Sequence, residues 1–289
     1  MPEIHSVEPH SSFAARVRLD DIGLLLDGSR ASNELSQLLD HYLVLHLVAE
    51  QPITKPVMGR LGFVLGFPEE RRHQRGGRPG GPPCDTPGFE FIGDYLGRPA
   101  ASLAAPATRA PAYIESLHYD GITLYSLQAN FNVPPTTPNL WCDMRDAYRT
   151  LPAELQIIAD CRHALHAAVP PPPAPFADFP PFEPQRARRQ PLVIKHPRSQ
   201  QPALYLPRNT LSRIEGLGEQ ESTEILERFW QHVNTRAARY TALIGHNELV
   251  IWDGLATTHT NPAYPPGQPR TTWFFSVPAP NKQLQSYFG

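Results

Sequence analysis

The residues best suited to chemistry are a histidine and an aspartate that stand two positions apart, His118 and Asp120, in the segment LHYDG. In an extended chain, residues two apart point to the same side, so this imidazole and this carboxylate can reach one metal ion together. A third ligand must come from a distant segment, and His259, at the end of residues 249–259, is the best candidate. Taken alone, a histidine–aspartate pair is weak evidence, because such pairs more often make surface or capping contacts.

Two histidines and one carboxylate on one face of a metal, with the remaining positions open, are typical of non-haem Fe(II) oxygenases. An open site of this kind must hold 2-oxoglutarate, whose far carboxylate needs a cation. Arg270 lies 11 residues after His259, and the planar guanidinium fits a carboxylate with two parallel hydrogen bonds. The sequence therefore predicts His118, Asp120 and His259 as metal ligands and Arg270 as the residue that binds the cosubstrate.

The elements expected to position these residues are mainly short strands with helices between them. Helical periodicity is expected over residues 32–48, 143–159 and 222–232, with the end of the first apolar enough to be a strand and Ser222 capping the last. Strands are expected where short apolar runs are bounded by turn residues, at 121–130, 192–194, 203–206, 240–244, 248–251 and 271–277. This pattern favours a mainly β, double-sheet barrel with inserted helices over a parallel α/β fold.

Two segments are rich in proline and glycine and lack periodicity. Residues 71–83 read RRHQRGGRPGGPP and belong to a predicted lid loop over residues 68–111. Residues 169–191, with four consecutive prolines, are expected to form an irregular, polyproline-like excursion. Both are predicted to be parts of one domain that spans residues 1–289.

Composition excludes several other classes of protein. The net charge of −2 gives no electrostatic reason to expect a nucleic acid or a membrane surface as partner. The three cysteines are too few and too widely spaced for a disulfide framework or a zinc site of the CxxC type. The N-terminus carries charged residues where a secretory signal would be apolar, so a cytoplasmic protein is expected, with assembly of identical chains left open.

Several ordered motifs resemble those of the taurine dioxygenase-like (TauD/TfdA) family of Fe(II)/2-oxoglutarate dioxygenases. They are MRDAYRTLP at 144–152, KHP at 195–197, ALY at 203–205 and ELVIWDG at 248–254, followed by His259 and Arg270. The resemblance covers about residues 110–279. It implies a double-stranded β-helix (jelly-roll) core, the cofactors Fe(II), 2-oxoglutarate and O₂, and the same metal ligands and arginine.

Some positions depart from the family pattern. Asn139 stands where the family commonly has a threonine that contacts 2-oxoglutarate, and its amide can still donate a hydrogen bond. Phe274 stands where taurine dioxygenase has a second arginine for the sulfonate, which argues against a sulfonate substrate held in that way. Asp120 retains the carboxylate whose loss would indicate a halogenase.

The resemblance implies oxidation of a small, anionic substrate, with succinate and CO₂ as co-products. Hydroxylation of a carboxylate-bearing or amino-acid-like molecule is the main expectation. Two alternatives are a desaturating, ring-forming or isonitrile-forming oxidase of specialised metabolism, and a non-catalytic β-barrel that binds a metal or ligand. The candidate substrate contacts are Arg71, Arg72, Tyr113, Tyr119, Arg208 and Phe274.

Overall fold

The structure is a computed structural model that describes residues 4–26, 30–65, 89–93, 123–130, 138–166, 188–207, 212–260 and 271–278. Its strands are β1 (Ile4–Pro9), β2 (Ala14–Leu19), β3 (Val44–Ala49), β4 (Phe89–Gly93), β5 (Thr123–Asn130), β6 (Asn139–Asp143), β7 (His163–His166), β8 (Arg188–Pro191), β9 (Val193–Lys195), β10 (Pro202–Leu204), β11 (Arg213–Ile214), β12 (Arg239–Ala242), β13 (Glu248–Asp253), β14 (Thr257–Thr260) and β15 (Thr271–Pro278). Its helices are η1 (Ile22–Leu26), α1 (Arg30–His41), α2 (Lys55–Val64), α3 (Met144–Arg149), α4 (Ala153–Cys161) and α5 (Glu219–Arg236).

Two sheets pack face to face and enclose the buried side chains around the candidate site. The large sheet has seven described strands in the order β1-β2-β3-β13-β5-β15-β4, and the small sheet has the order β12-β6-β14. All pairs in these sheets are antiparallel except β2 with β3. The side chains between the sheets belong to one hydrophobic cluster, which includes Val44, Trp141, Tyr240, Val250 and Trp252.

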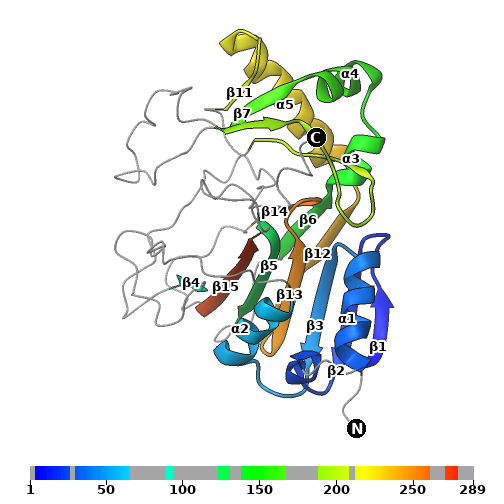
Figure 1. Ribbon diagram of the computed structural model, residues 1–289, viewed down its shortest axis with the longest axis vertical. Helices are drawn as coiled ribbons and strands as arrows, with labels where there is room; N and C mark the ends of the chain where they lie inside the picture. Colours follow the sequence, from blue (N-terminus) through cyan, green and yellow to red (C-terminus); the bar gives the residue numbers. More distant parts are fainter. Residues whose placement is uncertain are drawn as a thin grey trace.

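The opposite face of the large sheet packs against helices. Residues two apart on a strand share a face, so Leu249 and Ile251 of β13 lie on the side away from Val250. They belong to a second hydrophobic cluster with residues of α1, α2 and η1. Figure 1 shows α1 along the β1–β2–β3 side of the molecule and α2 near β13.

A second group of elements lies at the other end of the molecule (Figure 1). It contains the three-stranded sheet β11-β7-β8, the two-stranded sheet β10-β9, and helices α3, α4 and α5. Its apolar residues, such as Ile194, Leu204 and Phe229, belong to the same cluster as the side chains between the two sheets. The small sheet is therefore packed on both sides.

The segment predicted as a helix over residues 32–48, with an end apolar enough to be a strand, forms a helix followed by a strand. Helix α1 ends at His41, and Val44–Ala49 form the strand β3. The single helix predicted over residues 143–159 is wrong, because the chain forms α3 and α4 with a break at Pro152. Proline lacks a backbone N–H and closes one helix while starting the next. Asp143 is the N-cap of α3, and its side chain accepts hydrogen bonds from the backbone N–H groups of Arg145 and Asp146.

Ser222 does not begin a helix, which corrects the predicted cap. Helix α5 begins at Glu219 after Gly218, so Ser222 lies within its first turn. The Ser222 hydroxyl is buried and accepts a hydrogen bond of 2.7 Å from the backbone N–H of Ile214. Its function is therefore to join α5 to β11.

Both segments that were predicted to be irregular include a strand, so their predicted bounds are too wide. The strand β4 lies inside the predicted lid of residues 68–111 and pairs with β15. The strand β8 forms the last four residues of the excursion at 169–191 and pairs with β7. The rest of both segments lies outside the described residues. The strands β1 and β2 had not been predicted, because their residues combine apolar and charged side chains without a clear alternating pattern.

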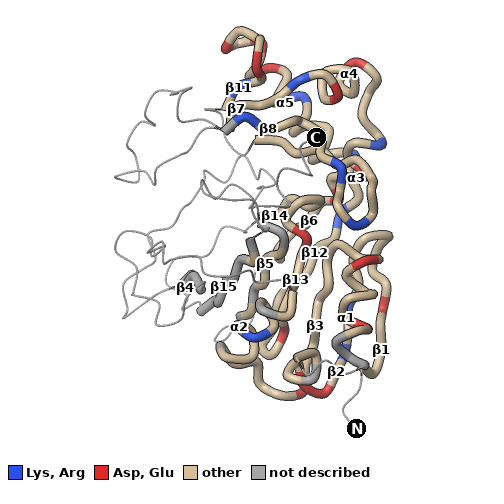
Figure 2. The backbone as a smooth tube through the Cα atoms, viewed as in Figure 1, with Lys and Arg blue, Asp and Glu red and all other residues tan. Residues whose placement is uncertain are grey.

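Charged residues of both signs are interspersed along the described elements, in line with the net charge of −2 (Figure 2). The strand β3 carries no Lys, Arg, Asp or Glu, and β13 carries them only at its ends, Glu248 and Asp253. None of the described helices is both long enough and apolar enough to cross a membrane.

Candidate metal centre

His259 lies on β14 between the two sheets, with 1% of its surface exposed. Its ring stacks on the indole of Trp141, at 5.1 Å between centroids and 27° between planes. The indole of Trp252, which belongs to the large sheet, also packs against the His259 imidazole, with 4.7 Å between the ring centroids and 39° between the ring planes. Two indoles from different sheets therefore fix the orientation of the imidazole that the sequence predicted as a metal ligand.

Asn139 lies next to the nitrogen of His259 that points away from the backbone. Its Oδ1 is 3.3 Å from His259 Nε2, and both side chains are buried. Asn139 and Trp141 are two residues apart on β6, which places them on the same face of the small sheet. A ligand bound near His259 Nε2 would thus be within reach of the Asn139 amide, where the sequence had predicted a contact with the cosubstrate.

The turn that leads to His259 is held by Asp253, the last residue of β13. Its Oδ1 accepts hydrogen bonds of 2.8 Å from the backbone N–H groups of both Leu255 and Ala256. Its Oδ2 lies 2.9 Å from His196 Nε2 and 3.4 Å from Arg198 Nη2. One buried carboxylate therefore connects the β13–β14 turn to the segment after β9.

Asp253 is kept ionised although its side chain is completely buried. Burial by itself raises the pKa of Asp253, but the charge and hydrogen bond of His196, then the charge of Arg198, together hold this pKa below its usual value. Arg198 lies over the ring of Tyr125, at 5.1 Å from its centroid, and also pairs with Asp40 at 3.2 Å. His196 therefore has a polar role as a partner of the buried Asp253 carboxylate.

Glu248, the first residue of β13, gathers an equivalent set of partners at the other end of the strand. His46 Nε2 lies 2.9 Å from its Oε2, and Arg16 Nη2 donates to its Oε1 at 2.6 Å. Burial raises the pKa of Glu248, but the hydrogen bond from His46, then that from Gly245 N–H and the charges of His46 and Arg16, lower it below its usual value. Both ends of β13 therefore carry a carboxylate that is paired with one histidine and one arginine.

Sequence reasoning assigned no role to Trp141, Tyr240 or His46. The signal for Trp141 was available, since it alternates with Asn139 on a short apolar strand. No local pattern indicated that Tyr240 and His46 meet, because they are 194 residues apart in the sequence. His166 is a further buried histidine. It is 3% exposed, neither ring nitrogen has a partner among the described residues, and burial lowers its pKa to about 4.

Most of the other predicted site residues lie outside the described residues. They are His118, Asp120, Arg270, Arg71, Arg72, Tyr113, Tyr119 and Arg208. The nearest described elements are β5, which begins three residues after Asp120, and β15, which begins directly after Arg270. Phe274 lies on β15, paired in register with Glu90 and Gln128.

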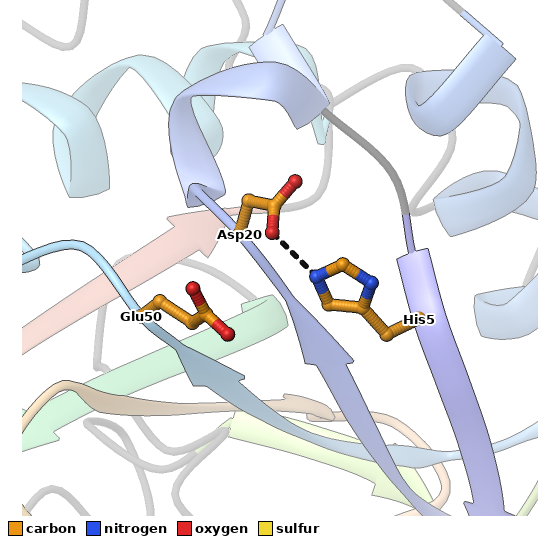
Figure 3. A group of neighbouring side chains, drawn as sticks. All are labelled: His5, Asp20 and Glu50. Carbon is orange, nitrogen blue, oxygen red and sulfur yellow. Dashed lines mark hydrogen bonds and ion pairs between the residues drawn. The ribbon is translucent and has the colours of Figure 1, made fainter. Parts of the chain in front are cut away.

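Within the described part of the chain, one group of side chains has the composition and spacing of a metal site, and it is separate from His259. It consists of His5, Asp20 and Glu50, on and beside the ends of β1, β2 and β3 (Figure 3). His5 and Asp20 are hydrogen-bonded to each other, with 47% and 34% of their side chains exposed. These are the properties of a surface ion pair, and the group shares no residue with the predicted centre.

Residues 137–277 match the model of a family described as taurine catabolism dioxygenase TauD, TfdA. The matched segment contains Asn139, Asp253, His259 and Arg270 and does not reach His118 or Asp120. Enzymes of this family use Fe(II), 2-oxoglutarate and O₂.

Solved structures with similar folds include AAD-2 in complex with Mn(II) and N-oxalylglycine, with a TM-score of 0.74 and 19% identity. That likeness covers 96% of this chain and 99% of AAD-2. A taurine dioxygenase from Burkholderia xenovorans gives a TM-score of 0.68 and 20% identity, over 95% of this chain and 89% of that one. At these identities the likeness concerns the fold, and it confirms the predicted jelly-roll type, here with its described sheets not closed into a barrel.

Pentalenolactone F synthase from Streptomyces arenae is 29% identical to the chain over 80 residues. These residues are 28% of this chain and 27% of the synthase. The match thus spans about a quarter of the length of this relative.

Proposed function

We propose that the chain is an Fe(II)- and 2-oxoglutarate-dependent oxygenase that oxidises a small molecule, because residues 137–277 match the model of the taurine catabolism dioxygenase TauD, TfdA family. The observation that carries the proposal is the environment of His259. This histidine is buried between two sheets, packs against two indoles, and has an amide beside its Nε2. A metal ligand needs such fixed orientation, since coordination geometry tolerates little movement.

The proposed metal ligands are His118, Asp120 and His259. Two imidazoles and one carboxylate suit Fe(II) and leave positions open for other ligands. Asn139 is proposed to hydrogen-bond the cosubstrate through its amide, and Arg270 to bind its far carboxylate. The chemistry supplied by iron bound at this site is oxidative decarboxylation of 2-oxoglutarate to succinate and CO₂, coupled to oxidation of the substrate.

The protein's own contribution is to orient the ligands and to limit access of water. Trp141 and Trp252 both pack against the His259 ring and against each other, with 5.8 Å between the two indole centroids, so the imidazole cannot rotate freely. Asp253 sets the turn that leads to His259 through its two backbone hydrogen bonds. Both features keep His259 Nε2 directed at one point, where a metal would be bound.

The proposed substrate is a small carboxylate-bearing or amino-acid-like molecule, and the proposed reaction is hydroxylation. Phe274 in place of a second arginine supports a substrate other than a sulfonate held by that arginine. Arg71, Arg72 and Arg208 are proposed to attract the anionic group, with Tyr113 and Tyr119 lining the pocket. The proposed setting is a cytoplasmic enzyme of one domain.

A second candidate is an oxidase of specialised metabolism that forms a ring or a double bond. The match to pentalenolactone F synthase favours it, because that relative is named for the synthesis of such a product. The mass of the product separates the two candidates. A gain of one oxygen supports hydroxylation, and a loss of two hydrogens supports the alternative.

The test is anaerobic loading of the purified protein with Fe(II) and 2-oxoglutarate, followed by visible spectroscopy. Chelation of the iron by the cosubstrate gives a metal-to-ligand charge-transfer band, which His259→Gln should abolish. His246→Gln is the matched control, because His246 is an exposed histidine near the start of β13. A band that persists in His259→Gln, or no band in the wild-type protein, would contradict the proposal. Succinate formed after admission of O₂ then reports turnover.

A further inference from the structure

A row of ring side chains crosses the small sheet and starts at His259. On β6, Trp141 is paired in register with His259 of β14 on one side and with Tyr240 of β12 on the other. The centroid of the Trp141 ring is 5.1 Å from that of His259 and 5.7 Å from that of Tyr240. Since cross-strand neighbours share a face, the sheet register itself builds a continuous row from the predicted metal ligand to Tyr240.

The hydroxyl of Tyr240 has a proton acceptor from the opposite sheet. It lies 2.9 Å from Nδ1 of His46, whose Nε2 lies 2.9 Å from Glu248. The Glu248 carboxylate only accepts hydrogen bonds, so the neutral His46 ring must carry its proton on Nε2. Its Nδ1 is then an acceptor, and Tyr240 O–H donates to it.

These groups are enclosed, which limits how Tyr240 can lose its proton. Tyr240 and His46 are 6% and 2% exposed. Burial, opposed by Arg16 and assisted by Glu248, raises the pKa of Tyr240 to about 12. The phenolate is therefore not formed near neutral pH. If Tyr240 is oxidised, its proton must leave with the electron, and His46 is placed to take it.

Trp141 lacks such an acceptor. Its indole Nε1 is buried and has no hydrogen-bond partner among the described residues. An oxidised Trp141 would therefore keep its proton and remain a strong one-electron oxidant. The contrast gives the row a direction, because an electron is drawn from Tyr240, which can release its proton, to Trp141, which cannot.

We propose that Tyr240, through Trp141, is an internal electron donor that protects the metal centre when O₂ reacts there without substrate being oxidised. The inference rests on the proposed function, which supplies the oxidant. Iron bound at this site would supply, with O₂ and 2-oxoglutarate, the oxidant, and Trp141 would donate one electron to it. Trp141 recovers an electron from Tyr240, and the phenolic proton passes to His46 Nδ1.

The products of this step would be the oxidant reduced by one electron, intact Trp141, a neutral tyrosyl radical at Tyr240, and a His46 imidazolium. The Glu248 carboxylate, 2.9 Å from His46 Nε2, stabilises the imidazolium. A soluble one-electron reductant such as ascorbate or a thiol then restores Tyr240, and His46 returns the proton. The exposed ring of His10, 5.8 Å from the Tyr240 ring, marks the side from which a reductant can approach.

The first experiment uses the iron-free full chain, so it does not depend on the proposed function. A photo-excited ruthenium polypyridyl complex with a sacrificial electron acceptor oxidises the protein, and the frozen sample is examined by electron paramagnetic resonance. A tyrosyl radical is expected, and Tyr240→Phe should abolish most of it and leave a tryptophan radical. His46→Gln should lower its yield, because the amide is a far weaker base. A tyrosyl signal unchanged in Tyr240→Phe would overturn the inference.

Tyr205→Phe is the matched control. Tyr205 is also buried and stacks on a histidine, His166, at 5.6 Å. Its loss should leave the tyrosyl signal and its yield unchanged. The unfolding midpoint of each variant identifies any that are misfolded, and because phenylalanine keeps the ring, a folded Tyr240→Phe protein is expected.

The second experiment uses protein loaded with Fe(II) and 2-oxoglutarate, exposed to O₂ without substrate. Peptide mass spectrometry then measures oxygen addition at Trp141, Trp252 and His259. A several-fold increase in Tyr240→Phe, but not in Tyr205→Phe, supports the inference, and equal oxidation in all three proteins overturns it. If the wild-type protein consumes no 2-oxoglutarate, the proposed function fails, and the radical experiment decides whether the row donates electrons.

Discussion

The buried carboxylate at the end of β13 gives the sharpest test of how the candidate centre is held together. Asp253→Asn keeps the size and shape of the side chain and removes its charge. The amide oxygen can still accept the two backbone hydrogen bonds of 2.8 Å from Leu255 and Ala256. What is lost is the ionic partner of His196 and Arg198. The substitution therefore isolates the contribution of charge.

The expected loss is large because Asp253 is completely buried and His196 is 2% exposed. Removing one member of a buried ion pair costs about 3–5 kcal/mol, since it leaves the other charge without compensation. Arg198 keeps Asp40, and its side chain is 27% exposed, which reduces the penalty on that side. We therefore expect Asp253→Asn to lower the free energy of unfolding by about 3 kcal/mol, at the lower end of that range.

Asp40→Asn is a matched control, because Asp40 pairs with the same arginine, at 3.2 Å. The Asp40 side chain is 62% exposed, and exposed ion pairs contribute at most about 1 kcal/mol. Urea unfolding followed by circular dichroism and fluorescence measures both variants. Equal losses in the two variants, or a loss under about 1 kcal/mol in Asp253→Asn, would refute the reasoning from burial.

The buried ion pair of Asp253 with His196 also predicts that stability depends on pH. The pKa of Asp253 is lowered in the folded protein, so its contribution is fully present above the pKa of the unfolded chain. It is lost as the pH falls from there toward the folded pKa. Asp253→Asn should lack this part of the acid sensitivity, and urea unfolding at a series of pH values measures it.

Three further substitutions test other buried groups. His166→Phe should make the free energy of unfolding less dependent on pH, because the pKa of His166 is about 4 when folded and 6.5 otherwise. Because His166 is protonated in the unfolded chain before it is protonated in the folded one, the free energy of unfolding of the wild-type protein should fall by about 3 kcal/mol as the pH falls from 6.5 to about 4. Equal pH profiles of stability in the wild-type and His166→Phe proteins would contradict this. Ser222→Ala leaves the buried Ile214 N–H without its 2.7 Å acceptor, so calorimetry should give a loss of about 1–3 kcal/mol, whereas a neutral result would mean that another acceptor replaces it. Asp143→Ala removes both the N-cap of α3 and the 3.0 Å ion pair with Arg145 and should cost about 1 kcal/mol or more, whereas Asp143→Asn, which keeps a capping oxygen but loses the ion pair, should cost less in the same urea assay.

The sequence by itself determined the parts of this protein that depend on local pattern. Leucines at helical spacing predicted α1, and the short apolar runs predicted β5, β12, β13 and β15 to within a few residues. The order of the motifs indicated the resemblance to the family whose model matches residues 137–277.

Local pattern failed where a neighbouring element supplied the deciding contact. Ser222 resembles a helix cap, but its hydroxyl is used by Ile214 of β11, and α5 begins three residues earlier. The strands β1 and β2 carry mixed side chains, and their pairing with β3 makes them regular. In both cases a hydrogen bond to a distant residue outweighs local propensity.

Only the tertiary structure decided which buried groups face each other between the sheets. Tyr240 meets Trp141 because β12 and β6 pair in one register, and it meets His46 because the large sheet lies opposite. A shift of one residue would turn these side chains to the other face. Register is set by packing over the whole sandwich, so no segment contains the information alone. That is the physical reason why the sequence could suggest His259 as a candidate ligand, while it could not indicate the row of rings that begins at this residue.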